Sequence, residues 1–394
     1  MRIGIDGGCL ANRRGFGRFA RQTLAALGDA GSAHEFAVLV DRPSLDVVRV
    51  PERFETIAVE VRQAPSVAAS ARGRRGVRDL LAMGRAAARA RLDLIFFPAS
   101  YSFFPVWNVP RVVVTMHDTL ALAHPGLVFP SWRGRVAWTI KEHAAARWAD
   151  RIVTVSDAAR RDLIAWFGLA EDRVRVVTEG PSEAFRPIPA GPESDAVLTR
   201  YQIDPARRFL LYVGGLSPHK NLPRLIEAFA RAADHATDLV LVGDMGDVFH
   251  THVPELYAAV NRSHIPDRVK FTGFVPDADL AHLYGRAYAL VQPSLMEGFG
   301  LPPVEAMACG TPVLASRAGS LPEVIGDAGT FFDPRDVDSI ADTIRSFLGD
   351  ADGRARLASR ALERARRFTW AAAARAILEC FDELDGIGSG RIGA

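Results

Sequence analysis

Two glutamates eight positions apart stand in the segment whose residue types are best suited to chemistry. Glu297 lies in a glycine-flanked loop after the strand-like run ending at Gln292, and Glu305 lies in the helical stretch opened by Pro302 or Pro303. The start of such a helix offers free backbone N–H groups and a partial positive charge, which suit a diphosphate. Carboxylates accept hydrogen bonds from hydroxyl groups but repel phosphate. We therefore expect both glutamates to contact hydroxyls on either side of a bound diphosphate.

A second segment combines glycines with a cation. The strand-like run ending at Val213 is followed by Gly214 and Gly215, and Lys220 comes next at a helix start. A lysine ammonium is a compact charge that suits phosphate oxygens. We expect Lys220 to be exposed, so that replacing it with alanine damages turnover more than folding.

The N-terminal half contributes a glycine-rich loop and a histidine. Gly15, Gly17 and Arg18 follow the first strand-like run, and His117 follows the run Arg111–Met116. Any tight strand-to-helix turn uses glycine, so this loop is either a structural turn or a phosphate contact through Arg18. A histidine at the carboxyl end of a parallel strand lies on the ligand side of a sheet, where it can bond hydroxyls. The alternative is a histidine with a structural role only.

Metal-binding signatures have structural explanations. The triplets Asp277–Asp279 and Asp336–Asp338 both fall where helices begin, so capping and the helix dipole account for their carboxylates. The cysteines Cys9, Cys309 and Cys380 have neither metal-ligand nor disulfide spacing. We expect no metal and no resident cofactor.

Composition excludes several classes of protein. The 394 residues carry a net charge of only +2, which argues against a nucleic-acid binder. The sequence contains no run of about 18 apolar residues, so we expect no membrane span. The first residues do not resemble a secretion signal. We therefore expect a cytoplasmic location, with peripheral contact at the inner face of the membrane as an option.

Two basic segments bear on that option. The stretch Arg72 to Arg91 holds seven arginines against one aspartate, and Trp132 to Trp148 mixes tryptophans with basic residues. Such segments suit an anionic membrane or a phosphate-bearing acceptor. The alternatives are a solvated helix face for the first and buried tryptophans with outward arginines for the second.

Short strand-like runs alternate with helical patterns along the chain, which is typical of parallel sheets with crossover helices. A proline-rich stretch from Glu179 to Pro192 interrupts the alternation and predicts a linker. We expect an α/β protein with two Rossmann-like, doubly wound domains over 1–188 and 200–368. Ligands bind such sheets beyond the carboxyl ends of the strands, which here would form an interdomain cleft. A last helix over 369–385 packs on either domain, with return to the N-terminal domain as one option, and 386–394 forms a disordered tail.

The predicted elements are these. Strands are expected at Arg2–Asp6, Phe36–Val40, Thr56–Val61, Leu92–Phe97, Arg111–Met116, Arg151–Val155, Phe209–Val213, Leu239–Val242, Val269–Phe271, Ala289–Gln292 and Pro312–Ala315. Helices in the first half are expected at Phe16–Leu27, Val77–Ala90 and Trp132–Trp148. Helices in the second half are expected at Leu222–Ala232, Ala278–Tyr284, Pro302–Cys309, Val337–Leu348 and Arg354–Arg367.

The segment from Glu297 to Glu305 resembles the E-x7-E element of retaining glycosyltransferases of the GT-B fold, family 4 (group 1). The resemblance implies that Glu297 contacts hydroxyls of the donor hexose and that Glu305 holds the nucleotide ribose. It also implies that the backbone of Gly298, Phe299, Gly300 and Leu301 cradles sugar and phosphate.

Other segments are similar to further elements of the same family. The resemblance assigns Lys220, after Gly214, to the leaving diphosphate. Many members carry an arginine where this chain has Gly215, so His219 or an arginine from elsewhere would supply the second cation. It further assigns Gly15, Gly17 and Arg18 to a loop facing the diphosphate and acceptor, and His117 to donor or acceptor hydroxyls. Gly243, Phe274 and Val275 fall at positions that contact the nucleoside.

The resemblance implies a metal-independent enzyme that transfers a hexosyl group with retention of configuration. The segments G-F-G-R, H-D-T and G-L-S-P-H-K-N look most similar to bacterial mannosyltransferases of polysaccharide assembly. GDP-mannose is thus the favoured donor, with UDP-hexoses as alternatives, and the acceptor is a glycan or a polyprenyl-diphosphate-linked glycan.

Other functions stay open. An inverting transferase or a nucleotide-sugar epimerase of the same fold needs a catalytic base, for which His117 and Asp118 are the first candidates. A dehydrogenase is disfavoured because Gly4, Gly7 and Gly8 do not form G-x-G-x-x-G. A non-catalytic binding module is the least favoured, given the set of donor elements.

Overall fold

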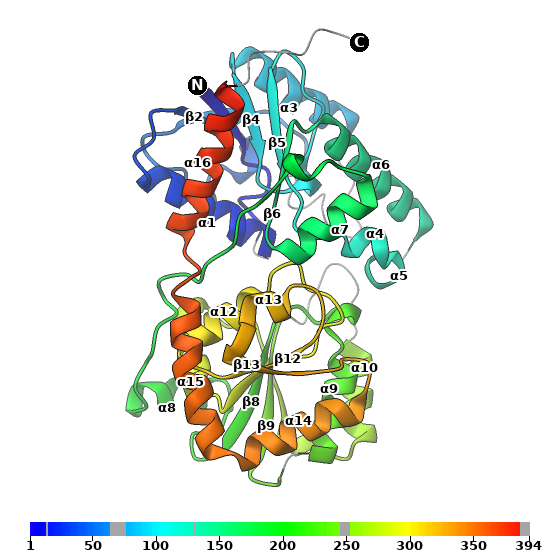
Figure 1. Cartoon of the computed structure of the whole chain (residues 1–394), viewed down its shortest axis with the longest axis vertical. Coiled ribbons are helices and arrows are strands. Elements are labelled where there is room, and N and C mark those ends of the chain that lie inside the picture. The colour runs from blue at the N-terminus through cyan, green and yellow to red at the C-terminus, as the bar shows by residue number, and fades with distance from the viewer. Residues whose placement is uncertain (13–14, 64–75, 130, 233, 245–252, 387–394) are drawn as a thin grey trace. The chain divides into compact units, whose positions relative to one another are not determined.

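The computed structural model describes residues 1–12, 15–63, 76–129, 131–232, 234–244 and 253–386 (Figure 1). The chain divides into two units. The N-terminal unit comprises Met1–Ala123, Phe129–Glu179 and Thr369–Ala394, and the C-terminal unit comprises His124–Val128 and Gly180–Phe368. The expected tail at 387–394 and the first arginines of the basic stretch, at 72–75, lie outside the described residues.

The N-terminal unit is built on a seven-stranded parallel sheet of order β3-β2-β1-β4-β5-β6-β7. Its strands are β1 (Arg2–Asp6), β2 (Glu35–Asp41), β3 (Glu55–Val59), β4 (Leu94–Phe97), β5 (Arg111–Thr115), β6 (Arg151–Thr154) and β7 (Val174–Val176). Its helices are α1 (Gly15–Asp29), α3 (Val77–Arg89), α4 (Leu120–Ala123), α6 (Trp132–Trp148), α7 (Asp157–Phe167) and α16 (Trp370–Gly386). Strand order reverses between β1 and β4, which marks the switch point of this sheet.

The last helix belongs to the N-terminal unit. Helix α16 lies against α1, as Figure 1 shows, and its ring of Trp370 meets that of Phe19 at a centroid distance of 6.0 Å. Phe381, on the same helix, meets Phe96 of β4 at 5.6 Å. These aromatic contacts bury the apolar face of a helix that is remote in sequence from the rest of its unit.

The C-terminal unit is built on a six-stranded parallel sheet of order β10-β9-β8-β11-β12-β13. Its strands are β8 (Arg208–Val213), β9 (Thr237–Val242), β10 (Val269–Gly273), β11 (Ala289–Gln292), β12 (Val313–Ser316) and β13 (Gly329–Phe332). Its helices are α5 (Pro125–Val128), α8 (Pro192–Arg200), α9 (Leu222–Ala232), α10 (Val253–Arg262), α11 (Asp277–Arg286), α12 (Leu301–Ala308), α13 (Leu321–Ile325), α14 (Val337–Gly349) and α15 (Ala351–Ala365). A 3₁₀ turn, η4 (Pro218–Lys220), precedes α9.

The inner strands of both sheets are buried, as parallel sheets covered by helices require, whereas the edge strand β3 is largely exposed. Four residues of β11 and the last five of β8 are buried, so each strand is a continuous buried run rather than an alternating one. The structure confirms the predicted α/β class with two Rossmann-like units. Strand β13 and helix α10 were not predicted, and β3 begins and ends earlier in the sequence than the expected strand Thr56–Val61.

In the described part of the chain, no helix is both long enough and apolar enough to cross a membrane.

Candidate functional site

The switch point of the C-terminal sheet brings Lys220 and Glu297 together. Strands β8 and β11 are neighbours where the strand order reverses, and η4 and the loop 293–300 follow their carboxyl ends. Lys220 Nζ lies 2.6 Å from Glu297 Oε1, and the two side chains are only 16% and 12% exposed. The expectation that Lys220 is exposed is therefore wrong, because the loop after β11 covers the ammonium and pairs with it.

Three donors hold a single oxygen of Glu297. Besides Lys220, Gln292 Nε2 donates to Oε1 at 2.8 Å and Ser294 Oγ donates to the same oxygen at 2.6 Å. Gln292 and Ser294 are both fully buried. Among the described residues no hydrogen bond reaches the second oxygen, Oε2, so this oxygen can accept one from a ligand hydroxyl.

The electrostatics keep Glu297 ionised. Burial by itself raises the pKa of this carboxyl, but the charge of Lys220 and the hydrogen bonds from Lys220 and Ser294 outweigh burial and hold the pKa below its ordinary value. The backbone is fixed as well, since the Glu297 carbonyl accepts hydrogen bonds from the Ser320 N–H at 3.2 Å and Oγ at 3.1 Å. Gly319 is needed beside it, because its φ is +55° and an added Cβ would lie 2.5 Å from that carbonyl oxygen.

The loop ends at the N-terminus of α12. Gly300 adopts a left-handed conformation with φ +105°, and within the described part of the chain no side chain caps the helix. Phe299 is 4% exposed and packs against Phe368 at a centroid distance of 5.5 Å, and Leu301 is also buried. Their side chains thus anchor the loop, while the backbone of Gly298 to Leu301 is the part that can meet a ligand.

Glu305 lies about one turn into α12 and is only 2% exposed. The hydroxyl of Tyr284, from α11, donates a hydrogen bond to its Oε2 at 3.0 Å. Tyr284 in turn packs against Phe185 at 5.6 Å. The second glutamate of the motif is therefore held in a drier environment than the first, and its contact with a ribose stays a prediction.

The strand ends of β8, β9 and β10 meet through glycines. The N–H of Gly214 donates to the Val242 carbonyl at 3.0 Å, and the N–H of Gly243 donates to the Gly273 carbonyl at 3.1 Å. A Cβ on Gly243 would lie 2.4 Å from the Gly214 carbonyl oxygen, so only glycine fits there. This close approach leaves bare backbone at the edge where a nucleotide is expected.

Two further expected contacts differ in exposure. Phe274, after β10, is 63% exposed, whereas Val275 is 3% exposed and belongs to the core. The Tyr212 hydroxyl donates to the carbonyl of Gly215 at 2.6 Å, which fixes the turn where many family members carry an arginine. Of the expected nucleoside contacts Gly243, Phe274 and Val275, Phe274 is thus the one whose side chain is exposed enough to stack on a base.

Without a bound ligand, His219 does not carry the positive charge expected of a second cation. Burial, followed by the adjacent charge of Lys220, lowers the pKa of His219 to about 3, although Glu297 opposes both. The imidazole is therefore neutral at neutral pH in this structure.

In the N-terminal unit His117 is enclosed on several sides. The side chain is 8% exposed, its Nε2 lies 3.2 Å from the Pro98 carbonyl oxygen, and its Nδ1 lies 3.6 Å from Glu179 Oε1. The rings of Phe16 and Phe19 lie 4.9 and 4.8 Å from the imidazole. Sequence reasoning treated Glu179 only as the start of a linker and missed this pairing.

The glycine-rich loop after β1 is only partly described, because residues 13–14 lie outside the described residues. Gly15 is exposed at the start of α1, whereas a Cβ on Gly17 would lie 1.8 Å from the Asn12 carbonyl oxygen. Arg18 is half-buried and takes part in an interaction within the chain. Gly17 thus has a clear structural role, and the ligand role of this loop stays a prediction.

The aspartate triplets have partners within the protein. Asp336 Oδ1 accepts from the Asp338 N–H at 2.9 Å and caps α14. Asp279 accepts from Arg200 and from the Tyr201 hydroxyl, both at 2.7 Å. Across the described ranges, no group of three or more His, Cys, Asp or Glu side chains is arranged to hold a metal ion.

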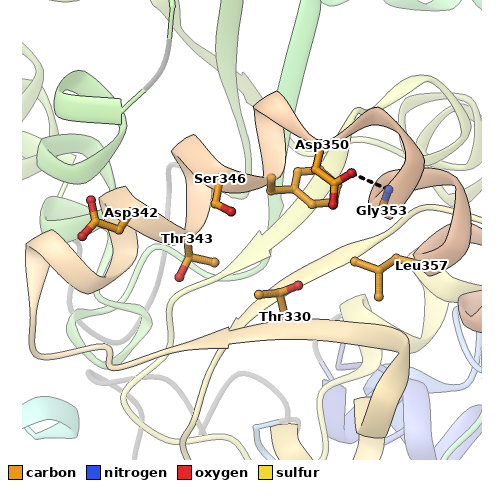
Figure 2. A pocket seen from close by; sticks show the side chains of 8 residues that line it. Thr330, Asp342, Thr343, Ser346, Asp350, Gly353 and Leu357 are labelled. Atoms are coloured by element: carbon orange, nitrogen blue, oxygen red, sulfur yellow. Dashed lines mark hydrogen bonds between the residues drawn. The ribbon is translucent and has the colours of Figure 1, made fainter.

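A separate hollow of about 330 Å³ lies between β13, α14 and α15 (Figure 2). Its two carboxylates are already used: Asp350 accepts from the Gly353 N–H at 2.7 Å, and Asp342 pairs with Arg345. This hollow offers little chemistry, and the donor elements lie elsewhere in the unit.

Two families match the two halves of the chain. Residues 196–364 match Glycosyl transferases group 1, and residues 13–181 match Glycosyltransferase Family 4. The chain is 36% identical over 281 residues to O-antigen chain mannosyltransferase B of Escherichia coli, covering 68% of this chain and 69% of that protein. It is 31% identical over 287 residues to the serotype-specific mannosyltransferase WbdA of Escherichia coli, covering 71% of this chain but only 34% of WbdA.

Among solved structures, sucrose-phosphate synthase from Thermosynechococcus elongatus superposes with a TM-score of 0.76 at 22% identity. The match covers 98% of this chain and 99% of that one. At this identity the likeness establishes the fold, which is GT-B. Three findings support the same family. These are the two family matches, the 36% identity to the first relative, and the paired lysine and glutamate at the switch point. The chain belongs to the family 4, group 1 glycosyltransferases.

Proposed function

We propose that this glycosyltransferase moves a mannosyl group from GDP-mannose to a growing glycan, with retention of anomeric configuration. The observation that carries the proposal is the Lys220–Glu297 pair at the switch point, beside the uncapped start of α12. The mannosyl group is favoured because the relatives reported above are mannosyltransferases of O-antigen or serotype-specific type. A UDP-hexose is the alternative donor.

The two charged side chains of the pair are proposed to contact different parts of the donor. A lysine ammonium has three N–H donors, of which one is directed to Glu297, so two are available to diphosphate oxygens. Glu297 uses Oε1 to hold its position and presents Oε2 to a hexose hydroxyl. The negative charge is thus directed to the sugar and the positive charge to the leaving group.

The proposed reaction needs no divalent ion. The bond between the anomeric carbon and the diphosphate breaks, and the acceptor oxygen forms its bond on the same face of the sugar. The acceptor proton passes to the leaving phosphate oxygen. Lys220 and the start of α12 stabilise the charge that develops there, which is the role of preorganised donors in catalysis.

The first experiment is a binding screen of the whole chain against GDP-, UDP- and ADP-sugars by thermal shift. A nucleotide-sugar at a hundred times its Kd adds about 2.7 kcal/mol to the free energy of unfolding. We expect GDP-mannose to give the largest shift. A larger shift with a UDP-hexose would replace the donor, and no shift with any nucleotide-sugar would refute the proposal.

The second experiment concerns mechanism. With the donor in hand, proton NMR of the product is expected to show the donor's anomeric configuration, and turnover is expected to survive excess EDTA. An inverted product would require a base, for which His117 and Asp118 are the first candidates. Loss of turnover in EDTA would contradict the proposed mechanism and make the aspartate triplets the first candidates for metal ligands.

The acceptor is proposed to be a polyprenyl-diphosphate-linked glycan, reached at an anionic membrane. Helix α6 carries an exposed apolar stripe at the helical spacing i, i+4, i+8, formed by Trp132, Val136 and Ile140, which are 70%, 46% and 65% exposed. The acidic residue of α6, Glu142, is buried, so the exposed charges of the helix are basic. Trp beside basic residues suits the interface of an anionic bilayer.

Flotation with vesicles tests this surface. The chain is expected to float with vesicles containing phosphatidylglycerol and not with neutral ones, in a salt-sensitive manner. Replacing Trp132 and Ile140 together by serine is expected to weaken flotation, whereas replacing Trp166, an exposed tryptophan of α7, serves as the matched control. Equal flotation of both variants, or none by the parent chain, would contradict the proposal.

A further inference from the structure

One ring nitrogen in the donor region has no hydrogen-bond partner among the residues that the structure describes. His219 lies in η4 between Pro218 and Lys220, and its carbonyl accepts a hydrogen bond from the Leu295 N–H at 2.8 Å. That bond ties the turn to the loop that carries Glu297. Across the described residues, His219 Nδ1 is buried and makes no hydrogen bond.

An unpaired buried nitrogen is costly. Leaving a buried donor or acceptor without a partner destabilises the folded protein, and such groups in folded proteins call for an explanation. The explanation here is local, because His219 adjoins the cation expected to bind the leaving group. A ligand with oxygen atoms at Lys220 would give the ring the partner that the protein does not supply.

The protonation of the His219 ring depends on burial and on the charges of two neighbouring residues. Desolvation and the positive charge of Lys220 favour the neutral imidazole, and Glu297 opposes them. Helix α5, which also contacts η4, carries no titratable side chain. A diphosphate at Lys220 would add two negative charges and reverse this balance, because an opposite charge close by favours the protonated form.

We propose that His219 binds the diphosphate of the donor as an imidazolium, taking one proton from solvent when the nucleotide-sugar binds. This inference rests on the proposed function and deepens it. Gly215 has no side chain to offer, so the imidazolium supplies the second positive charge on the leaving group beside Lys220. The proton is returned to solvent when the nucleoside diphosphate departs, so the cycle is balanced.

Isothermal titration calorimetry measures this proton directly. The whole chain is titrated with GDP-mannose, and separately with UDP-glucose, in PIPES and in Bis-Tris at the same slightly acidic pH. The diphosphate of a nucleotide-sugar does not titrate near neutrality, so proton uptake belongs to the protein. We expect an apparent enthalpy that depends on buffer, corresponding to up to one proton. Below the pKa of His219 in the complex, affinity should fall by up to about tenfold for each unit by which pH rises, and it should level off above that pKa.

Two variants assign the proton. His219→Gln is expected to bind more weakly, with an apparent enthalpy that no longer depends on buffer and an affinity that no longer depends on pH. His219→Asn serves as the second replacement if the glutamine variant does not fold. His235→Gln, an exposed histidine before β9, is the matched control and should keep the uptake of the parent chain.

The outcomes separate this inference from the proposed function. Binding with the same enthalpy in both buffers overturns the inference and leaves the proposed function standing. Proton uptake that persists in His219→Gln also overturns it, because another group then takes the proton. Absence of binding by either nucleotide-sugar refutes the proposed function, and the inference falls with it.

Discussion

Replacing Lys220 by methionine isolates the charge of the buried pair, because methionine keeps most of the apolar stem. Removing one partner of a buried ion pair costs about 3–5 kcal/mol. Here Gln292 and Ser294 still donate to Glu297, and the pair is 16% and 12% exposed, so we expect a loss of roughly 3 kcal/mol. For a unit of this size that corresponds to a fall in Tm of about 6–12 °C.

The pH dependence of this loss has a definite sign. In the parent chain the pKa of Glu297 is lowered, so its stabilising contribution is present above the ordinary carboxyl pKa and is lost as pH falls through the lowered value. In Lys220→Met the ammonium no longer opposes burial, so the pKa of Glu297 is expected to be higher than in the parent chain. The difference in Tm is therefore largest at neutral pH and narrows as the medium becomes acidic.

Thermal denaturation followed by circular dichroism measures the effect, and a double variant controls it. Lys220→Met with Glu297→Gln removes both charges and is expected to recover most of the lost stability. Turnover should fall by on the order of 10²-fold or more in both, because the leaving group loses its charge donor. A single variant as stable as the parent chain, or a double variant no more stable than the single one, would refute the reasoning.

Three further changes test other parts of the donor region. Glu305→Gln should keep the fold and the contact with Tyr284. It should weaken donor binding by about 10- to 150-fold, which is the equivalent of a charge-assisted hydrogen bond of about 1.5–3 kcal/mol. An unchanged Kd would mean that another residue contacts the ribose. Phe274→Ala should leave Tm unchanged because the ring is 63% exposed, yet raise the donor Kd by roughly 5- to 150-fold if the ring stacks on the base. Gly319→Ala should lower Tm, since its Cβ would lie 2.5 Å from the Glu297 carbonyl at a φ of +55°; a Tm equal to that of the parent chain would show that the loop can relax.

The sequence allowed the scaffold of the site to be predicted because its signals are local. The alternation of strand and helix, and glycine or proline where each strand gives way to a loop, are properties of neighbouring residues. The rule that ligands bind beyond the carboxyl ends of parallel strands then placed Lys220 and Glu297 at one edge. Strand β13 escaped prediction because it has four residues, begins with glycine and has mostly half-buried side chains.

The partners of the predicted residues could not be found in this way. Glu179 is 62 positions from His117 in the sequence, and only the folded sheet of the N-terminal unit brings them to 3.6 Å. Gln292 looked like the last residue of a strand, yet its amide is one of the groups that orient Glu297. The error over Lys220 has the same origin, since exposure depends on a loop 77 positions away.

The two glutamates of one motif show why spacing alone does not fix chemistry. Glu297 lies in a loop, where a lysine, an amide and a hydroxyl converge on one oxygen and keep the carboxylate charged while its other oxygen stays available. Glu305 lies on the helix that follows, 2% exposed and held by a tyrosine hydroxyl. A carboxylate that contacts the reacting sugar must be held rigidly and still have one oxygen accessible to the ligand. A carboxylate that binds the ribose, which does not react, can be buried more deeply. The difference in environment is thus what the two proposed roles require, and it arises from residues outside the motif itself.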